Sequence, residues 1–423
     1  MSEGRQANER WQKEYRGFVL FGVVAAVAAV VAVASAPIAA QAPRAAASTG
    51  AQATSYTPPR TAWGEPDLQG LWQGEQRINF ERPPELGGRE LYTDAEVVEK
   101  ERKANERNDL RLNGKQENRG NRNQPNYNAI VGYSPDRAQY AKRTSAIVDT
   151  PDGRLPPWTL EQVKRYEARE AATLGRGEAD WVVDRPTSER CIPVIPFPVL
   201  GFWGMTQSGH NAGVAETAET VNVGEGYSNS TSGGGPYRIV QTQGFVALLQ
   251  EESGLGGGQA GFQIISLDGR PHLGAKFRQW MGDSVGHWEG NTLVIETTNI
   301  KYPYPIITSY GPTYPGSGET LRFTQRFTRT GPDTMEFRYT VDDPGVYTRP
   351  YTVVHEMSRD DNYKISALAC HEGHDDMPSA LASGRVDEET ALENAADSRA
   401  SRTPRLQQLK EEAIKAAEQM KKR

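Results

Sequence analysis

The sequence predicts a mainly β protein, in which an antiparallel meander forms a barrel or a strongly bent sheet, lipocalin-like in general shape. Helical additions are expected at both the N-terminal and the C-terminal side. Apolar and polar residues alternate in short runs from residue 237 to residue 369, which is the period of half-buried strands. The chain has 42 glycines and 27 prolines among its 423 residues, enough for many turns. Roughly eight or nine strands without an intervening helix favour antiparallel pairing of neighbours.

The clearest strands are "ETLRFTQRFTRT" and "TMEFRYTVDD", separated by a turn at residues 331–333. Phe323 and Phe327 share one face of the first strand, and Phe337 and Tyr339 share one face of the second. Further hairpins are expected at Gly244 and at "GN", residues 290–291. These patterns predict one apolar and one polar face for the sheet.

Composition divides the chain into five parts. They are a signal sequence or N-terminal anchor (1–42), a flexible spacer (43–60), a helix- and loop-rich segment that packs on the β domain (61–200), the antiparallel β domain (201–376) and a helical tail (377–423). Capping boxes at Thr93 with Glu96 and at Thr159 with Gln162 predict two helix starts in the third part.

The N-terminal segment has no charge from Gly17 to Ala40 and follows a basic flank. This pattern predicts an export signal. The run also exceeds the ~20 residues that span a bilayer, so an uncleaved anchor in the inner membrane is the alternative. Both interpretations place the rest of the chain outside the inner membrane, in the periplasm or secreted.

The overall charge excludes some partners. The formal net charge is −6, and no stripe of Lys and Arg is present, so we expect no binding to nucleic acid. The glycine-rich stretch 253–261 has no lysine and opens no helix, so it is not a phosphate loop. We expect no cofactor, and a small molecule or a saccharide as the binding partner.

Cys191 and Cys370 are the only two cysteines. In an oxidising compartment such a pair most simply forms a disulfide. Closing so long a loop would stabilise the fold by at most about 5 kcal/mol. The alternative is two buried free thiols.

The stretch "CHEGH" follows a predicted strand and holds several possible metal ligands. His371 and His374 are three residues apart, whereas the helix of a zinc protease needs a spacing of four. A zinc-protease site is therefore excluded, and no residue is named as a metal ligand. A polar strand end tied to Cys191, another kind of metal site and part of a polar pocket remain as interpretations.

The stretch 266–290 has the richest mixture of acid–base and aromatic side chains. A carboxylate beside a histidine would orient it for proton transfer, and tryptophans stack on ligand rings. A long loop packed by its tryptophans is the alternative, as is a hydrogen-bonded core position for His355. The candidate catalytic residues are His272, Asp283, His371 and Glu372, and the candidate ligand-binding residues are Arg270, Trp280, Trp288 and His355.

Eight blocks in order, among them "TAWGEPDLQGLWQG", "ISLDGRPHL", "GDSVGHWEGNTLVIETTN" and "ACHEGH", resemble a large family of exported bacterial proteins that is abundant in soil species. The resemblance covers roughly residues 60–375 and implies a signal sequence and a shared fold, but no reaction. His272 and His371 match the family pattern. His374 stands where we expect Asn, and His287 where we expect Arg.

Three functions are compatible with these features. The first is binding of a small or sugar-like ligand in a pocket lined by the 268–289 loop and the strand end at 370–372. The second is a hydrolase or lyase with His272 or His371 as the base and Asp283 or Glu372 in support. The third is a structural envelope protein. A single site requires His272, Asp283, His355 and His371 to converge.

Overall fold

The structure is a computed structural model of the chain. It describes residues 56–73, 76–79, 81–113, 139–172, 237–250, 261–301, 320–362 and 407–422. Several sequence predictions fall outside these ranges. They are the apolar segment 17–40, the Cys191–Cys370 disulfide, and the strand end with His371 and Glu372.

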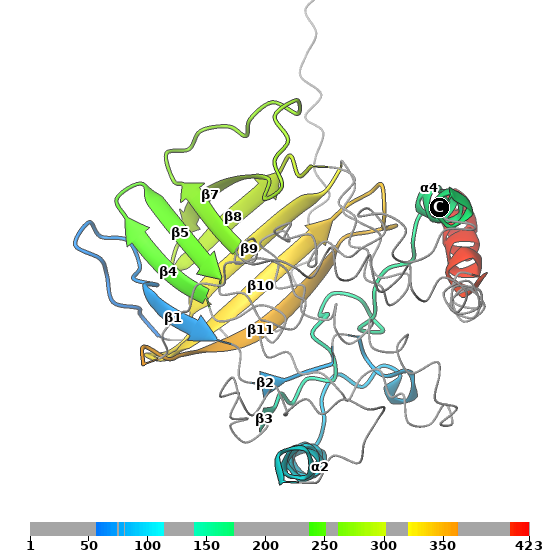
Figure 1. The fold of residues 1–423 in the computed structure, drawn as a ribbon, viewed down its shortest axis with the longest axis horizontal. Helices are drawn as coiled ribbons and strands as arrows, with labels where there is room; N and C mark the ends of the chain where they lie inside the picture. The colour runs from blue at the N-terminus through cyan, green and yellow to red at the C-terminus, as the bar shows by residue number, and fades with distance from the viewer. Residues whose placement is uncertain are drawn as a thin grey trace, which may run out of the picture. The chain divides into compact units, whose positions relative to one another are not determined.

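Nine strands close into a barrel, which confirms the predicted fold class (Figure 1). The strands are β1 (Gly70–Gln73), β4 (Tyr237–Thr242), β5 (Phe245–Gln250), β6 (Gly261–Ser266), β7 (Asp283–Glu289), β8 (Thr292–Thr298), β9 (Arg322–Arg329), β10 (Thr334–Asp342) and β11 (Tyr351–Arg359). The short strand β1 closes the ring, because it pairs antiparallel with both β4 and β11.

A ring of nine strands cannot be antiparallel at every pair, because alternating directions close only around an even number. One pair must be parallel, and here it is β6 with β7, which pair through Ser266 and Val285. All the other neighbours in the ring are antiparallel. The chain therefore cannot turn directly from β6 into β7. Residues 267–282, here called the crossover loop, carry it back along the wall.

Strand alternation directs aromatic side chains into the barrel. Phe327 and Phe337, which are opposite each other in the register, stack with ring centroids 4.5 Å apart. The rings of Phe323 and Tyr339 are 5.4 Å apart. All four side chains are buried, as their shared faces in the sequence predicted.

The segment Pro66–Leu68, which precedes β1, is hydrogen-bonded to inward side chains of the barrel wall. The inward side chain of Gln241 accepts a hydrogen bond from the backbone N–H of Leu68 at 2.6 Å and donates one to the carbonyl of Pro66 at 3.1 Å. Arg329 donates to the carbonyl of Asp67 at 3.1 Å and lies 5.6 Å from the ring centroid of Trp72. These buried groups satisfy backbone atoms that this segment would otherwise leave unpaired.

The remaining elements lie outside the barrel. They are a two-stranded sheet of β2 (Gln76–Arg77) and β3 (Gln139–Tyr140), the 3-10 helix η1 (Pro84–Leu86), and the helices α2 (Asp94–Asn113), α4 (Leu160–Ala172) and 407–421. Both predicted capping boxes lie at helix starts. The N–H of Glu96 donates to the hydroxyl of Thr93 at 3.3 Å, and the N–H of Gln162 to that of Thr159 at 3.1 Å.

These outer elements pack on the barrel along β11 and beyond it. The N–H of Val148 donates to the carbonyl of Thr352 at 3.0 Å, and the N–H of Thr159 to that of Val346 at 2.9 Å. Leu409 of the C-terminal helix is buried in the same core cluster as the barrel aromatics. None of the described helices is long and apolar enough to cross a membrane.

Candidate functional site

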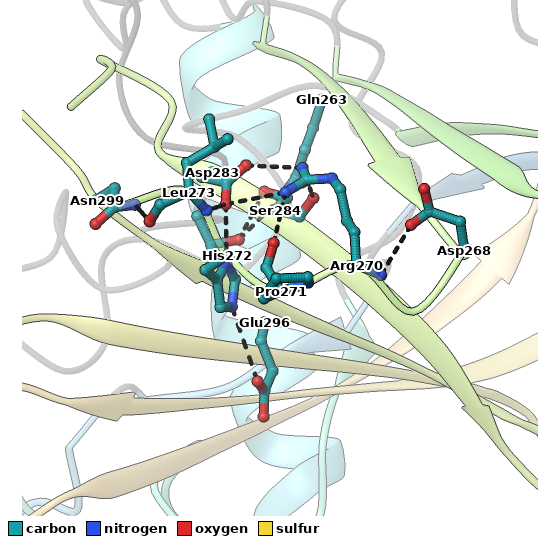
Figure 2. Close-up of polar contacts among 11 residues, drawn as sticks. Gln263, Asp268, Arg270, Pro271, His272, Leu273, Asp283, Ser284, Glu296 and Asn299 are labelled. Atoms are coloured by element: carbon teal, nitrogen blue, oxygen red, sulfur yellow. Dashed lines mark hydrogen bonds and ion pairs between the residues drawn. The ribbon is translucent and has the colours of Figure 1, made fainter. Parts of the chain in front are cut away.

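Asp283 is the centre of the most densely connected polar cluster on the barrel wall. It is the first residue of β7, and its side chain points to the outer face, because Ser284, the next residue, points inward. The crossover loop covers it, so that only 3% of the residue is exposed. Figure 2 shows Arg270, His272 and Leu273 of this loop converging on its carboxylate.

Four donors surround the Asp283 carboxylate. Arg270 donates from Nη2 to Oδ1 at 2.8 Å and from Nη1 to Oδ2 at 3.3 Å. Oδ2 also accepts from the backbone N–H of Leu273 at 2.8 Å and lies 3.0 Å from Nδ1 of His272. Burial alone would raise the pKa of Asp283, but the hydrogen bonds from Arg270, Leu273 and His272 outweigh it and lower the pKa. Asp283 is therefore an anion at neutral pH, and it fastens the loop to the strand.

His272 lies between two carboxylates. Nδ1 faces Asp283, and Nε2 lies 3.9 Å from Oε2 of Glu296 on β8 (Figure 2). Because the ionised Asp283 accepts a hydrogen bond, Nδ1 carries the proton, and a neutral ring then has its lone pair on Nε2. Nε2 has no hydrogen-bond partner among the residues that the structure describes. Nε2 is itself buried, and it faces the Glu296 carboxylate.

Local turn chemistry places the start of the crossover loop. The carboxylate of Asp268 accepts a hydrogen bond from the N–H of Arg270 at 3.0 Å, and Gly269 has φ +74°. A positive φ favours glycine, which has no Cβ. The hydrogen bond from the Arg270 backbone is the main reason that the pKa of Asp268 is lowered. Asp268 therefore acts as a turn former.

Asn299 holds the far side of the loop. Its side chain donates to the carbonyl of Leu273 at 2.6 Å, and its own φ is +56°, a left-handed conformation that asparagine tolerates. The backbone of Gln279 pairs with Asn299 and Lys301 next to it. The loop is thus tied to β7 through Asp283 and to the end of β8 through Asn299.

The structure brings together three of the predicted site residues: Arg270, His272 and Asp283. Trp280 lies on the same loop, where the ammonium group of Lys301 is 4.5 Å from its ring centroid. His371 and Glu372 lie outside the described residues.

Trp288 and His355 lie on the other side of the wall. Trp288 is opposite Leu293, and His355 is opposite Phe337, both of which point inward. His355 is buried, its ring lies 6.2 Å from that of Tyr339, and burial lowers its pKa to about 3. The single convergent site expected from the sequence therefore does not include these two residues.

Two functional positions were missed by the sequence interpretation, Glu296 and Asn299. Strand alternation in "NTLVIETT" places Glu296 on the outer face. Strand alternation does not show that the loop between the parallel strands β6 and β7 brings His272 close to Glu296. The sequence gives even less indication of the role of Asn299, because its left-handed backbone conformation depends on the loop to which it is hydrogen-bonded.

The surface beside the cluster is mixed in character. The side chains of Arg270, His272 and Glu296 are 32%, 23% and 36% exposed. Leu273 and Phe277 of the crossover loop expose apolar surface to solvent. Within the described ranges no group of three or more His, Cys, Asp or Glu is arranged to hold a metal ion.

No protein-family model matches this chain, and neither a curated protein nor a solved structure matches it. The interpretation of the site therefore rests on its own geometry.

Proposed function

We propose that this protein is an exported protein, periplasmic or secreted, which binds a small polar or sugar-like ligand on the outer face of its barrel. The observation that carries the proposal is the convergence of Arg270, His272 and Glu296, each partly exposed, from a loop and a strand that are fixed by buried Asp283. The export part rests on the uncharged segment 17–40.

The chemistry of this surface suits a neutral polyhydroxylated ligand. The Glu296 carboxylate accepts hydrogen bonds from hydroxyl groups. Both Nη groups of Arg270 already donate to Asp283, Pro271 and Ser284, which leaves its Nε–H as the donor toward a ligand. The exposed side chain of Leu273, which follows His272 in the loop, offers an apolar contact to such a ligand. Because Asp283 already engages both Nη atoms of Arg270, this arginine has little capacity for a second anion, which favours neutral ligands over acidic ones.

Acid–base catalysis is the second candidate, as a hydrolase or lyase. The observation in its favour is the orientation of His272, whose Nδ1 is 3.0 Å from Asp283 while Nε2 lacks a hydrogen bond within the described part of the chain. In this role His272 would take a proton at Nε2, and Asp283 would stabilise the resulting imidazolium. Glu296, opposite Nε2, would orient the substrate group that loses the proton.

Titration calorimetry with a panel of neutral mono- and disaccharides tests the binding proposal. We expect Glu296→Gln and His272→Gln to weaken binding at least tenfold. His287→Gln is the matched control, because His287 also lies on the outer face of β7 but is exposed and contacts Glu289 at 3.2 Å. Its binding should equal that of the unaltered protein.

Turnover assays with aryl glycosides and esters distinguish the two candidates. Binding without turnover supports the binding protein. Turnover that disappears in His272→Gln and persists in His287→Gln supports the enzyme. The proposal is wrong if the panel shows neither binding nor turnover, or if Glu296→Gln and His272→Gln bind the ligand like the unaltered protein. Either result favours the role of a structural envelope protein.

A further inference from the structure

The inside of the barrel wall has polar side chains of its own. Six of them, here called the inner polar belt, point inward from six different strands and are at least nine-tenths buried: Tyr237, Gln263, Ser284, Thr297, Tyr339 and His355. The outer cluster around Asp283 uses none of them. Asp283 and Ser284 are neighbours in β7 but lie on opposite sides of the wall.

One half of the inner polar belt is a connected hydrogen-bond network. The amide of Gln263 donates to the hydroxyl of Ser284 at 2.5 Å and to that of Thr297 at 3.2 Å. The two hydroxyls are 2.9 Å apart. This network joins β6, β7 and β8 on the inside of the wall, and within the described part of the chain it leaves the carbonyl oxygen Oε1 of Gln263 without a hydrogen bond.

The other half is aromatic and surrounds Phe337. The ring of Tyr237 lies 6.1 Å from the ring of Phe337, and the ring of Tyr339 lies 5.7 Å from it. His355 stacks on Tyr339 at 6.2 Å. Tyr237 also interacts electrostatically with Tyr339. Side chains from β4, β10 and β11 therefore meet in the interior.

Three polar atoms of the belt are buried without a hydrogen-bond partner among the described residues. They are Oη of Tyr237, Oε1 of Gln263 and Nε2 of His355. Buried polar groups in native proteins are hydrogen-bonded with few exceptions, so each exception calls for an explanation such as a bound molecule. All three side chains are directed into one barrel, and those of Tyr237 and His355 both lie beside the rings of Phe337 and Tyr339.

The belt carries no charge at neutral pH. Burial lowers the pKa of His355 to about 3, and burial raises the pKa of Tyr237 and of Tyr339. A charged ligand would have to leave water without a counter-ion on this belt, which is strongly unfavourable. The occupant that suits these groups is therefore neutral.

We propose that the barrel interior is a second binding site, for a small uncharged molecule with an apolar ring and a hydroxyl or carbonyl group. The ring lies against Phe337, and the polar group hydrogen-bonds to Oη of Tyr237 and Nε2 of His355. A barrel of eight strands can already hold one small ligand, and this one has nine. The site does not depend on the function of the outer cluster.

Phenol and benzyl alcohol are suitable probes, with binding measured by ligand-observed NMR and calorimetry on the full chain. We expect Tyr237→Phe to weaken phenol binding by about fivefold, because one hydrogen bond is lost. We expect His355→Leu to weaken it as well. Glu296→Gln, in the outer cluster, and His287→Leu, on the outer surface, should bind phenol like the unaltered protein, which separates this site from the outer one.

Two results would overturn the proposal. One is that the unaltered protein binds neither probe at millimolar concentration. The other is that Tyr237→Phe, which removes a single oxygen atom and should fold normally, binds phenol unchanged. If the unpaired atoms meet only water or nothing, Tyr237→Phe should also raise the melting temperature, since it removes a buried unsatisfied hydroxyl.

Discussion

Replacing Asp283 by asparagine isolates the charge that fastens the crossover loop. The two side chains have the same shape, so the packing of the 3% exposed residue is preserved. The carboxylate accepts hydrogen bonds from Arg270, His272 and the backbone of Leu273. An asparagine amide has one acceptor oxygen, and its NH₂ group would face donors. Hydrogen bonds to a charged group contribute about 1.5–3 kcal/mol each.

Not all of this stabilisation is lost in Asp283→Asn. The Arg270 side chain is 32% exposed and regains part of its hydration. The remaining oxygen of the asparagine keeps one or two of the donors. We therefore expect the free energy of unfolding to fall by about 3 kcal/mol at pH 7, at the lower end of the range for breaking a buried pair.

The loss should depend on pH in a defined direction. The pKa of Asp283 is lower in the folded protein than its ordinary value of about 3.9. A carboxyl group with a lowered folded pKa stabilises the protein fully above the unfolded pKa, and this contribution disappears as the pH falls through the folded pKa. The difference between the two proteins should be complete at pH 7 and shrink steadily below about pH 4.

Urea denaturation followed by tryptophan fluorescence, at pH 7 and at several values below pH 4, measures this difference. Asp268→Asn is the control, because Asp268 is an exposed turn residue of the same loop and should show a much smaller effect. A loss under about 1 kcal/mol at pH 7, or a loss that stays constant in acid, would refute the assignment of Asp283 as the charged anchor.

Two further predictions concern the barrel wall, and urea denaturation at pH 7 checks both. Gly286→Ala should cost about 1–3 kcal/mol, because its Cβ would lie 2.6 Å from a methyl group of Ile265. Gly274→Ala, with open space around the Cβ, should be nearly neutral. Arg329→Met should cost about 1–3 kcal/mol, because it leaves the carbonyl groups of Asp67, Gly331 and Pro332 without their charged donor. Arg326→Met on the same strand breaks only a surface ion pair and should cost less than about 1 kcal/mol.

The strands themselves were predictable because their signal is local. Alternation places Phe327 and Phe337 on one face of neighbouring strands, and the register pairs them directly. The hairpins at Gly244 and Gly290 follow from glycines that adopt φ +83° and +62° in the structure. A period of two and a turn residue are properties of five or ten consecutive residues, so no distant contact is needed to recognise them.

The closure of the barrel was not predictable in the same way. β1 is four residues long and was not among the strands predicted from the sequence. Trp72 becomes part of a strand only because Tyr237 and Arg359, far away in the sequence, supply partners on both sides. A pairing set by long-range contacts leaves no periodic pattern in so short a segment.

The candidate site was likewise predictable where residues are close in the sequence and unpredictable where they are distant. His272 lies on the crossover loop eleven residues before Asp283, the first residue of β7, and their contact was expected. His355 was expected to join them and does not, because the wall lies between them. In a barrel the direction of a side chain depends on whether its position in the strand is odd or even. His355 falls on the inner set and Asp283 on the outer set.

The number of strands is the common cause of both proposed sites. Because the ring has nine members, β6 and β7 run parallel, and the chain must cross back along the wall before β7 begins. That crossover brings Arg270 and His272 onto the outer face of Asp283. The same start of β7 directs Ser284 inward to Gln263. A hairpin between β6 and β7, as in a fully antiparallel ring, would be too short to place Arg270 and His272 over the outer face of Asp283.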